Sequence, residues 1–176
     1  MTLPLDIAKA LLPTIKRSHK AGRYGLDNIL HAPTTEGNTD APDGSQYVAT
    51  DGHVLVVIDT TTPAPTTEPA HYSYASVVAV VATKGHVSAP SVPGSCDFPD
   101  WKRCIPTTSI SVDAIGVGLA LLDTAFKVHK ALKLSEKAYW TATFSDAPGP
   151  LVLEPMSIKH DTIVRVRVVI MPVRIA

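Results

Sequence analysis

The sequence has few cysteines, few aromatic residues and no excess of charge of either sign. Its 176 residues include two cysteines, and aromatic residues make up 6% of the chain. Two cysteines exclude a disulfide-rich scaffold and a zinc site with four cysteine ligands. A bond between Cys96 and Cys104 could close a small loop, but we favour two reduced thiols in a cytoplasmic protein.

The charge balance and the absence of a long apolar run exclude two further classes. Lys and Arg number 16, as do Asp and Glu, so the formal net charge is zero. A DNA-binding or membrane-binding surface must therefore come from the distribution of charge. The longest apolar run, residues 115–122, is far short of the roughly 20 residues of a membrane helix. The N-terminus also lacks the pattern of a signal peptide, so we expect no membrane partner.

What is present is the composition of one globular domain. Hydrophobic residues make up 45% of the chain and charged residues 18%. Residues 5–20 predict an amphipathic helix, because Ile7, Leu11 and Ile15 share one face. Pro13 lies on the opposite face and leaves two alternatives, a kinked helix or a helix that begins near Pro13.

Strand and turn patterns follow this helix. Residues 23–31 predict a strand, and residues 46–50 and 53–59 predict a hairpin around Asp51-Gly52. Residues 33–45 and 60–69 are rich in turn-forming residues and predict exposed loops.

The second half has a similar order of elements. The valine-rich residues 76–87 predict a strand, residues 90–106 a loop and residues 111–134 a helix capped by Ser111. Two adjoining apolar rows run along the surface of that predicted helix. One consists of Ile115, Leu119, Leu122 and Phe126, and the other of Leu121, Ala125, Val128 and Leu132. The predicted strands that follow are 138–145, 151–156 and 162–171. We therefore expect an α+β fold of two helix-plus-antiparallel-strands halves, about 1–72 and 73–176, with helices packed on sheets.

The two predicted helices concentrate the positive charge. They and their flanks carry nine of the 16 basic residues, which are Lys9, Lys16, Arg17, Lys20, Arg23, Lys127, Lys130, Lys133 and Lys137. Two solvated amphipathic helices would explain this pattern. The alternative is a surface for a polyanion such as duplex DNA, with lysines contacting the backbone without reading sequence.

No pattern predicts an enzyme, a metal site or a cofactor. The seven histidines are scattered, and none has the spacing of a zinc motif. Gly116 and Gly118 fall within the predicted second helix, so they do not form a phosphate-binding loop. Asp51 and His53 are better explained by the hairpin turn than by catalysis.

Short motifs in one order resemble the bacterial DNA polymerase III β sliding clamp. They are RYGLDNIL at 23–30, ATDGHVL at 49–55, DFPDWKRCIP at 97–106 and VVIMPVRI at 168–175. The stretch 142–156 is similar to the hairpin that precedes the family's C-terminal tail. The resemblance implies a DNA-clamp-like domain and a non-catalytic replication accessory protein, with helices lining a ring around duplex DNA and sheets outside.

The resemblance also implies two sites. One is a hydrophobic cleft for linear peptide motifs of polymerases and other DNA-handling proteins, which carries over to Thr50, Gly52, His53, Leu55, Val169, Met171 and Pro172. The other is a DNA-facing surface, consisting of Lys9, Lys16, Lys20, Lys127, Lys130 and Lys133.

The chain departs from the family pattern in length and order. A bacterial clamp has three domains per chain, whereas this chain has the length of one. The segment 97–106 lies between the two halves here, whereas in the family it follows a complete domain, and Val54 replaces an expected arginine. Six copies could close a ring. Alternatively, the protein is a monomeric peptide-binding or competitor module, or a structural domain with neither activity.

Overall fold

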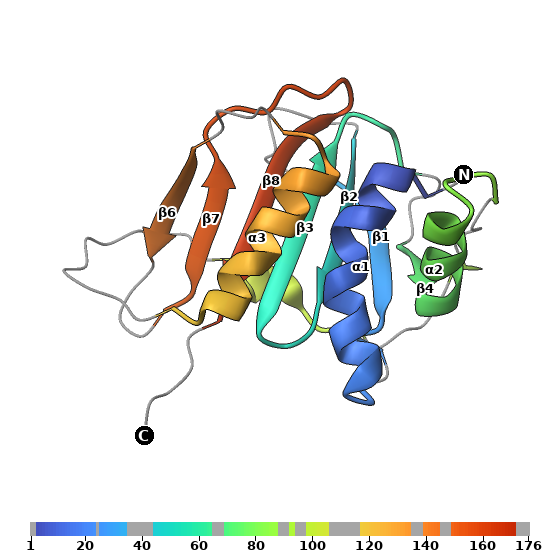
Figure 1. The fold of residues 1–176 in the computed structure, drawn as a ribbon, viewed down its shortest axis with the longest axis horizontal. Coiled ribbons are helices and arrows are strands. Elements are labelled where there is room, and N and C mark those ends of the chain that lie inside the picture. The colour runs from blue at the N-terminus through green and yellow to red at the C-terminus, as the bar shows by residue number, and fades with distance from the viewer. Residues whose placement is uncertain are drawn as a thin grey trace.

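The structure, a computed structural model, is one sheet with its α-helices on one face and a short 3₁₀ helix on the other (Figure 1). It describes residues 3–23, 25–34, 44–64, 69–87, 92–93, 98–105, 117–134, 139–144 and 149–171. The helices are α1 (Leu5–Lys20), α2 (Tyr74–Ala82), the 3₁₀ helix η1 (Trp101–Cys104) and α3 (Leu119–Ala131). The predicted α+β class, with helices packed on antiparallel strands, is confirmed.

The described sheet has eight strands, all antiparallel to their neighbours. They are β1 (Asn28–Pro33), β2 (Ser45–Thr50), β3 (Val54–Thr60), β4 (Ala70–Ser73), β5 (Val92–Pro93), β6 (Trp140–Phe144), β7 (Leu151–Pro155) and β8 (Ile163–Ile170). Their order is β5-β4-β1-β2-β3-β8-β7-β6. Strand β3 from the first half therefore pairs with β8 from the second, and one sheet joins both ends of the chain.

Helix α1 lies at the centre of the packing. Ile7, Leu11 and Ile15 are buried against the sheet, as their spacing predicts. The helix continues through Pro13, so the alternative of a helix starting near Pro13 is wrong. Pro13 lacks the N–H that would donate to the carbonyl of Lys9 in an ordinary helix, and it lies on the side of α1 that is not fully buried.

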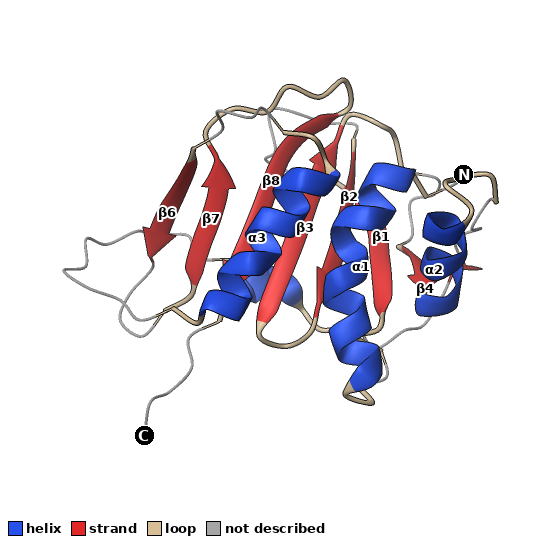
Figure 2. Cartoon of the chain, in the orientation of Figure 1, coloured by secondary structure: helices blue, strands red, loops and turns tan. Residues whose placement is uncertain are grey.

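Helices α1 and α3 lie side by side, with α2 beside α1 (Figure 2), and the colours of Figure 1 show that α1 and α3 run in opposite directions. Their buried side chains and the facing strand residues form one apolar cluster that includes Val56, Val77, Val128 and Val168. His31 is buried here too, stacked on Tyr47 with ring centroids 4.1 Å apart. The pattern of two helices on one sheet face is the part of the fold that positions the candidate sites.

The hairpin and the C-terminal strands are confirmed. Strands β2 and β3 pair in register from Ser45 with Thr60 to Thr50 with Leu55. The turn needs Gly52, whose φ of +85° lies in the left-handed region. Strands β6, β7 and β8 fall within the predicted ranges 138–145, 151–156 and 162–171.

The predicted strand at 76–87 is wrong, because most of it is helix α2. The Ser73 side chain caps this helix by accepting a hydrogen bond from the backbone N–H of Ser76. Val77 and Val80, three residues apart, are the buried positions. Helical spacing and a good cap therefore outweigh the β propensity of valine.

Two further predictions need correction. The strand predicted at 23–31 begins only at Asn28, because residues 25–27 form a turn in which Gly25 has a φ of +92°. The helix predicted at 111–134 corresponds to α3, which begins at Leu119 with Gly118 as its N-cap. Gly118 therefore precedes the helix and, contrary to the prediction, does not lie inside it. Ser111, much of the two predicted loops, Cys96 and Lys137 lie outside the described residues.

Candidate functional site

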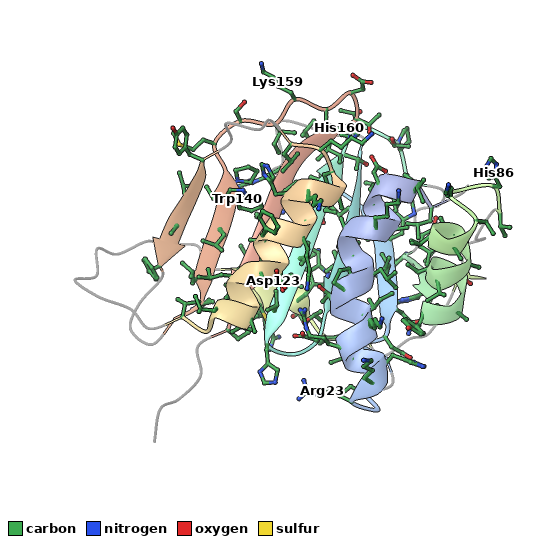
Figure 3. All side chains as sticks on the ribbon, viewed as in Figure 1. Arg23, His86, Asp123, Trp140, Lys159 and His160 are labelled. Carbon is green, nitrogen blue, oxygen red and sulfur yellow. The ribbon has the colours of Figure 1, made fainter. Side chains whose placement is uncertain are left out.

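The turn between β2 and β3 is organised by Asp51. One carboxylate oxygen of Asp51 accepts from the backbone N–H groups of His53 and Val54, at 2.9 and 2.8 Å. The other oxygen accepts from the Nε of Arg17 on α1. Arg23 donates to the carbonyl of Asp51 and to the ring of His53. Figure 3 shows Arg23 just past the end of α1.

The electrostatics of this turn favour a charged carboxylate. Burial alone would raise the pKa of Asp51, but the hydrogen bonds from Arg17, Val54 and His53 outweigh burial and hold the pKa below its ordinary value. Arg17 also donates to the Thr124 hydroxyl on α3, at 3.2 Å. One arginine thus connects both long helices to the turn.

The structure brings most of the predicted cleft residues together. Thr50 pairs with Leu55 across the hairpin, and Leu55 pairs with Val169 on β8. The backbone N–H of Met171 donates to the carbonyl of His53, at 2.8 Å. The hairpin turn and the end of β8 therefore form one continuous surface. Pro172, the seventh predicted cleft residue, lies outside the described residues.

The accessibility of these residues differs from that of an open cleft. Gly52 and His53 are exposed, and Met171 is half-buried. Leu55 and Val169, by contrast, are 1% and 0% exposed. Leu55 and Val169 are therefore covered and do not form an open docking surface in this structure, whereas Met171 remains partly accessible.

The cover comes from residues 98–105, on the sheet face opposite to the long helices. Trp101 of η1 is buried in a second apolar cluster with Leu55, Val57 and Val169. Phe98, Cys104, Ile105 and Met171 pack against this cluster and are partly buried. The sequence prediction used this segment only as a family landmark. Trp101, a large apolar residue in a loop rich in proline and charge, was a sequence signal that this loop packs against other apolar residues.

The opposite sheet face also carries a buried ion pair. Arg167 of β8 lies 3.0 Å from Asp59 of β3, and the Asp59 side chain is fully buried. Burial raises the pKa of Asp59 and lowers that of Arg167, while each partner's charge opposes the shift of the other. The more exposed pair Arg165 and Glu154 lies on the neighbouring strands β8 and β7.

The six predicted DNA-facing lysines are all exposed on α1 and α3 or just past the end of α3. They are Lys9, Lys16 and Lys20 in the first helix region and Lys127, Lys130 and Lys133 in the second. Lys127 forms an ion pair with Asp123 one turn earlier, and the other five have no ion-pair partner among the described residues. This side of the molecule therefore presents unpaired positive charge.

The same side carries an apolar region that the sequence analysis did not anticipate. Of the two apolar rows of the second helix, the row with Ala125 and Val128 is buried. Leu119 and Phe126 of the other row are 83% and 64% exposed. The face of α3 is thus apolar near its start and basic near its end.

The described residues offer little for other chemistry. They contain no cluster of three or more His, Cys, Asp or Glu residues placed to hold a metal ion. Within the same ranges, no helix combines the length and apolarity needed to cross a membrane. An open concavity of about 560 Å³ lies around the β7–β8 connection and includes Glu154, His160 and Arg165. Cys104 is a free thiol whose pKa is raised by burial and by the nearby Asp100 charge.

Comparison with known proteins finds similarity in structure only. No protein-family model matches the sequence, and no curated protein matches it. A sliding clamp from Bacillus subtilis superposes with a TM-score of 0.65 and 13% identity over 100% of this chain and 64% of its own. The Helicobacter pylori β clamp in complex with diflunisal gives 0.63 and 12%, over 99% of this chain and 65% of its own.

A third solved structure gives the same picture. The DnaN sliding clamp from Bartonella birtlesii, bound to griselimycin, gives a TM-score of 0.59 and 19% identity over 99% of this chain and 66% of its own. This chain therefore spans about two thirds of each clamp or slightly less. At these identities the likeness shows the fold, and the chain has the fold of bacterial sliding clamps.

Proposed function

We propose that this protein is a non-catalytic, clamp-like accessory protein of DNA replication. It associates with duplex DNA through its helix face and binds linear peptide motifs of polymerase-type proteins beside the β2–β3 turn. The observation that carries the proposal is the pair of antiparallel helices on one sheet face with exposed lysines, in a fold shared with sliding clamps. The chain acts as one clamp-like domain, and the pairing of β3 with β8 across its halves supports this.

The DNA part rests on charge that is available for a new partner. Lys16, Lys20 and Lys130 are exposed and have no ion-pair partner in the described part of the chain. Each lysine that neutralises one phosphate on duplex DNA adds about 0.9 to the slope of log affinity against log salt. Such contacts do not read sequence, which suits a protein that moves along DNA.

The DNA test compares two triple charge reversals of equal size. One reverses Lys16, Lys20 and Lys130 to Glu, and the control reverses Lys84, Lys102 and Lys159, three exposed lysines outside α1 and α3. Binding to a duplex of about 30 base pairs is measured across a salt series. We expect the first variant to lose at least about tenfold in affinity and to reduce the salt slope by about two to three. Equal losses in both variants would refute a helix-face site.

The peptide part rests on the surface made by the hairpin turn and the end of β8. His53 offers an exposed polar rim, and Met171 a half-buried, adaptable apolar side chain. We expect His53→Ala and Met171→Ala to weaken the binding of a clamp-binding peptide, measured by fluorescence anisotropy. His86→Ala, an exposed histidine outside the proposed surface, is the control. The substitution Leu55→Asp would test the stability of the fold and not peptide binding, because the Leu55 side chain is buried.

The oligomeric state separates a ring from a single module. The described sheet ends at β5 on one side and β6 on the other, and edge strands can pair with further strands. We propose that copies join edge to edge around DNA. Light scattering across a size-exclusion peak at two salt concentrations tests this. A mass near six subunits, or another closed ring, supports encirclement, whereas a monomer favours a peptide-binding module without a ring.

A further inference from the structure

The buried apolar residues of the predicted peptide cleft pack against a segment of the same chain. Leu55 and Val169 are adjacent on the outer sheet face and almost fully buried. Their cover includes Trp101, itself 6% exposed, with Phe98 and Cys104 beside it. One buried tryptophan packed on apolar sheet residues resembles the anchor of a bound peptide, since tryptophan is prominent among anchor residues at interfaces.

Among the described residues, segment 98–105 contacts the sheet through side-chain packing. Its described backbone hydrogen bonds are internal, from Trp101 to the carbonyl of Pro99 at 2.7 Å and from Ile105 to that of Lys102 at 3.2 Å. Its ion pair, between Arg103 and Asp100, is also internal and largely exposed. No described hydrogen bond joins residues 98–105 to a strand. Release of residues 98–105 therefore breaks no ladder hydrogen bond described in the structure and exposes no buried ion pair of these residues.

We propose that residues 98–105, anchored by Trp101, are an intramolecular plug that competes with peptide ligands for the groove floored by Leu55, Val57 and Val169. The competing ligand is a short linear peptide with an aromatic or bulky aliphatic anchor. This inference rests on the peptide site of the proposed function and adds regulation to it. A tethered plug acts at a high effective concentration, so only the unplugged fraction of molecules binds, and the apparent affinity falls by that fraction.

A different role for Trp101 predicts the opposite change in peptide affinity when its side chain is removed. If Trp101 were a fixed wall of the cleft, its removal would delete contacts and weaken peptide binding. If it is a plug, its removal frees the groove and strengthens binding. Truncation at one residue therefore separates the two roles without knowledge of the natural partner.

The first experiment supplies the plug in trans. The probe is a labelled synthetic peptide with the sequence of residues 98–105 and serine at the cysteine position. We expect the Trp101→Ala protein to bind it at least about tenfold more tightly than the wild-type protein, and not to bind a second peptide with alanine at the tryptophan position. Equal binding by both proteins, or no binding by either, would overturn the plug. Trp140→Phe is the control for loss of a tryptophan elsewhere.

The second experiment needs no peptide. In a Cys96→Ser background, Cys104 is the single thiol, and burial slows its alkylation. Trp101→Ala should raise the rate of Cys104 alkylation by iodoacetamide at least about tenfold, because truncation of the anchor releases the segment. Lys102→Ala, which removes an exposed neighbour, should leave the rate unchanged. Circular dichroism checks that the Trp101→Ala variant remains folded. An unchanged alkylation rate in this folded variant contradicts the plug.

The outcomes separate this inference from the function on which it rests. If Trp101→Ala weakens binding of a clamp-binding peptide, the peptide site stands and the plug fails. If alkylation accelerates and the trans peptide binds, but clamp-binding peptides do not, the plug stands and the proposed partner class fails.

Discussion

The two faces of the sheet are covered in different ways. On one face, β2, β3 and β8 pack against α1 and α3, two long helices that also contact each other. On the other face, the same strands pack against η1, a four-residue 3₁₀ helix. Because side chains alternate along a strand, each strand contributes to both clusters. One backbone therefore supports a rigid core on one side and a small, lightly attached cluster on the other.

This difference indicates which face can change without loss of the fold. The helix-covered face holds most of the buried apolar side chains. The opposite face combines a small apolar cluster with the buried pair of Asp59 and Arg167. Local opening with few broken contacts is more favourable there than on the helix-covered face. A ligand-responsive segment is expected on the less tightly packed side.

The largest effect on stability should come from breaking the buried ion pair on the sheet face that packs against η1. Asp59→Ala leaves Arg167, whose side chain is 12% exposed, without its acid partner. We expect a loss of about 3–5 kcal/mol in the free energy of unfolding, because an uncompensated charge remains in a buried site. Urea unfolding at neutral pH measures it. The double variant Asp59→Leu, Arg167→Leu should recover most of the loss, and a further loss would show that the pair itself stabilises the face.

The helix-covered face holds a titratable group that makes it sensitive to acid. His31 is fully buried against Tyr47, and burial lowers its pKa from 6.5 to about 4. Between pH 6.5 and 4 the unfolded chain binds a proton on His31 that the folded protein does not bind. Stability from this group is therefore complete above about pH 6.5 and falls by up to about 3 kcal/mol as the pH drops to 4.

The measurement is the unfolding free energy at several pH values from 7 to 4. His31→Phe should reduce the pH dependence in this range, while His86→Phe, at an exposed site, should leave it unchanged. The low pKa of Asp51 adds acid sensitivity of the same sign to every variant, so the difference between wild type and His31→Phe isolates His31. Parallel curves for these two proteins would contradict the assignment.

Local patterns predicted the elements whose signals lie within a few residues. The β2–β3 hairpin follows from Asp51-Gly52 between β-type runs, and α1 follows from the spacing of Ile7, Leu11 and Ile15. The valine-rich residues of α2 were misassigned, because residue type favoured a strand and the deciding signals were the Ser73 cap and tertiary packing. Similarly, periodicity revealed two apolar rows on α3 but not which of them faces the sheet.

The location of the candidate site was predictable from the sequence, but the burial of its apolar side chains was not. The motif resemblance predicted that the hairpin turn and the end of β8 lie together, and the pairing of Leu55 with Val169 agrees. Trp101 indicated that residues 98–105 pack on other apolar residues, but the sequence did not indicate which ones, because that depends on the path of a loop. The pair of Asp59 and Arg167 was also missed, since its partners are 108 residues apart.

The smallest effect compares neighbours on β3 that differ only in the face they occupy. Val56 and Val57 are both fully buried, Val56 beneath the helices and Val57 beneath residues 98–105. We expect Val56→Ala to cost about 2–3 kcal/mol and Val57→Ala about 1 kcal/mol, because a lightly attached segment can settle into the cavity and a helix-packed core cannot. Chemical denaturation of both variants measures this. In a Trp101→Ala background the cost of Val57→Ala should shrink while that of Val56→Ala stays the same. Equal costs in both backgrounds would mean that the 98–105 segment is held as firmly as the long helices, and the two faces would then differ in composition but not in rigidity.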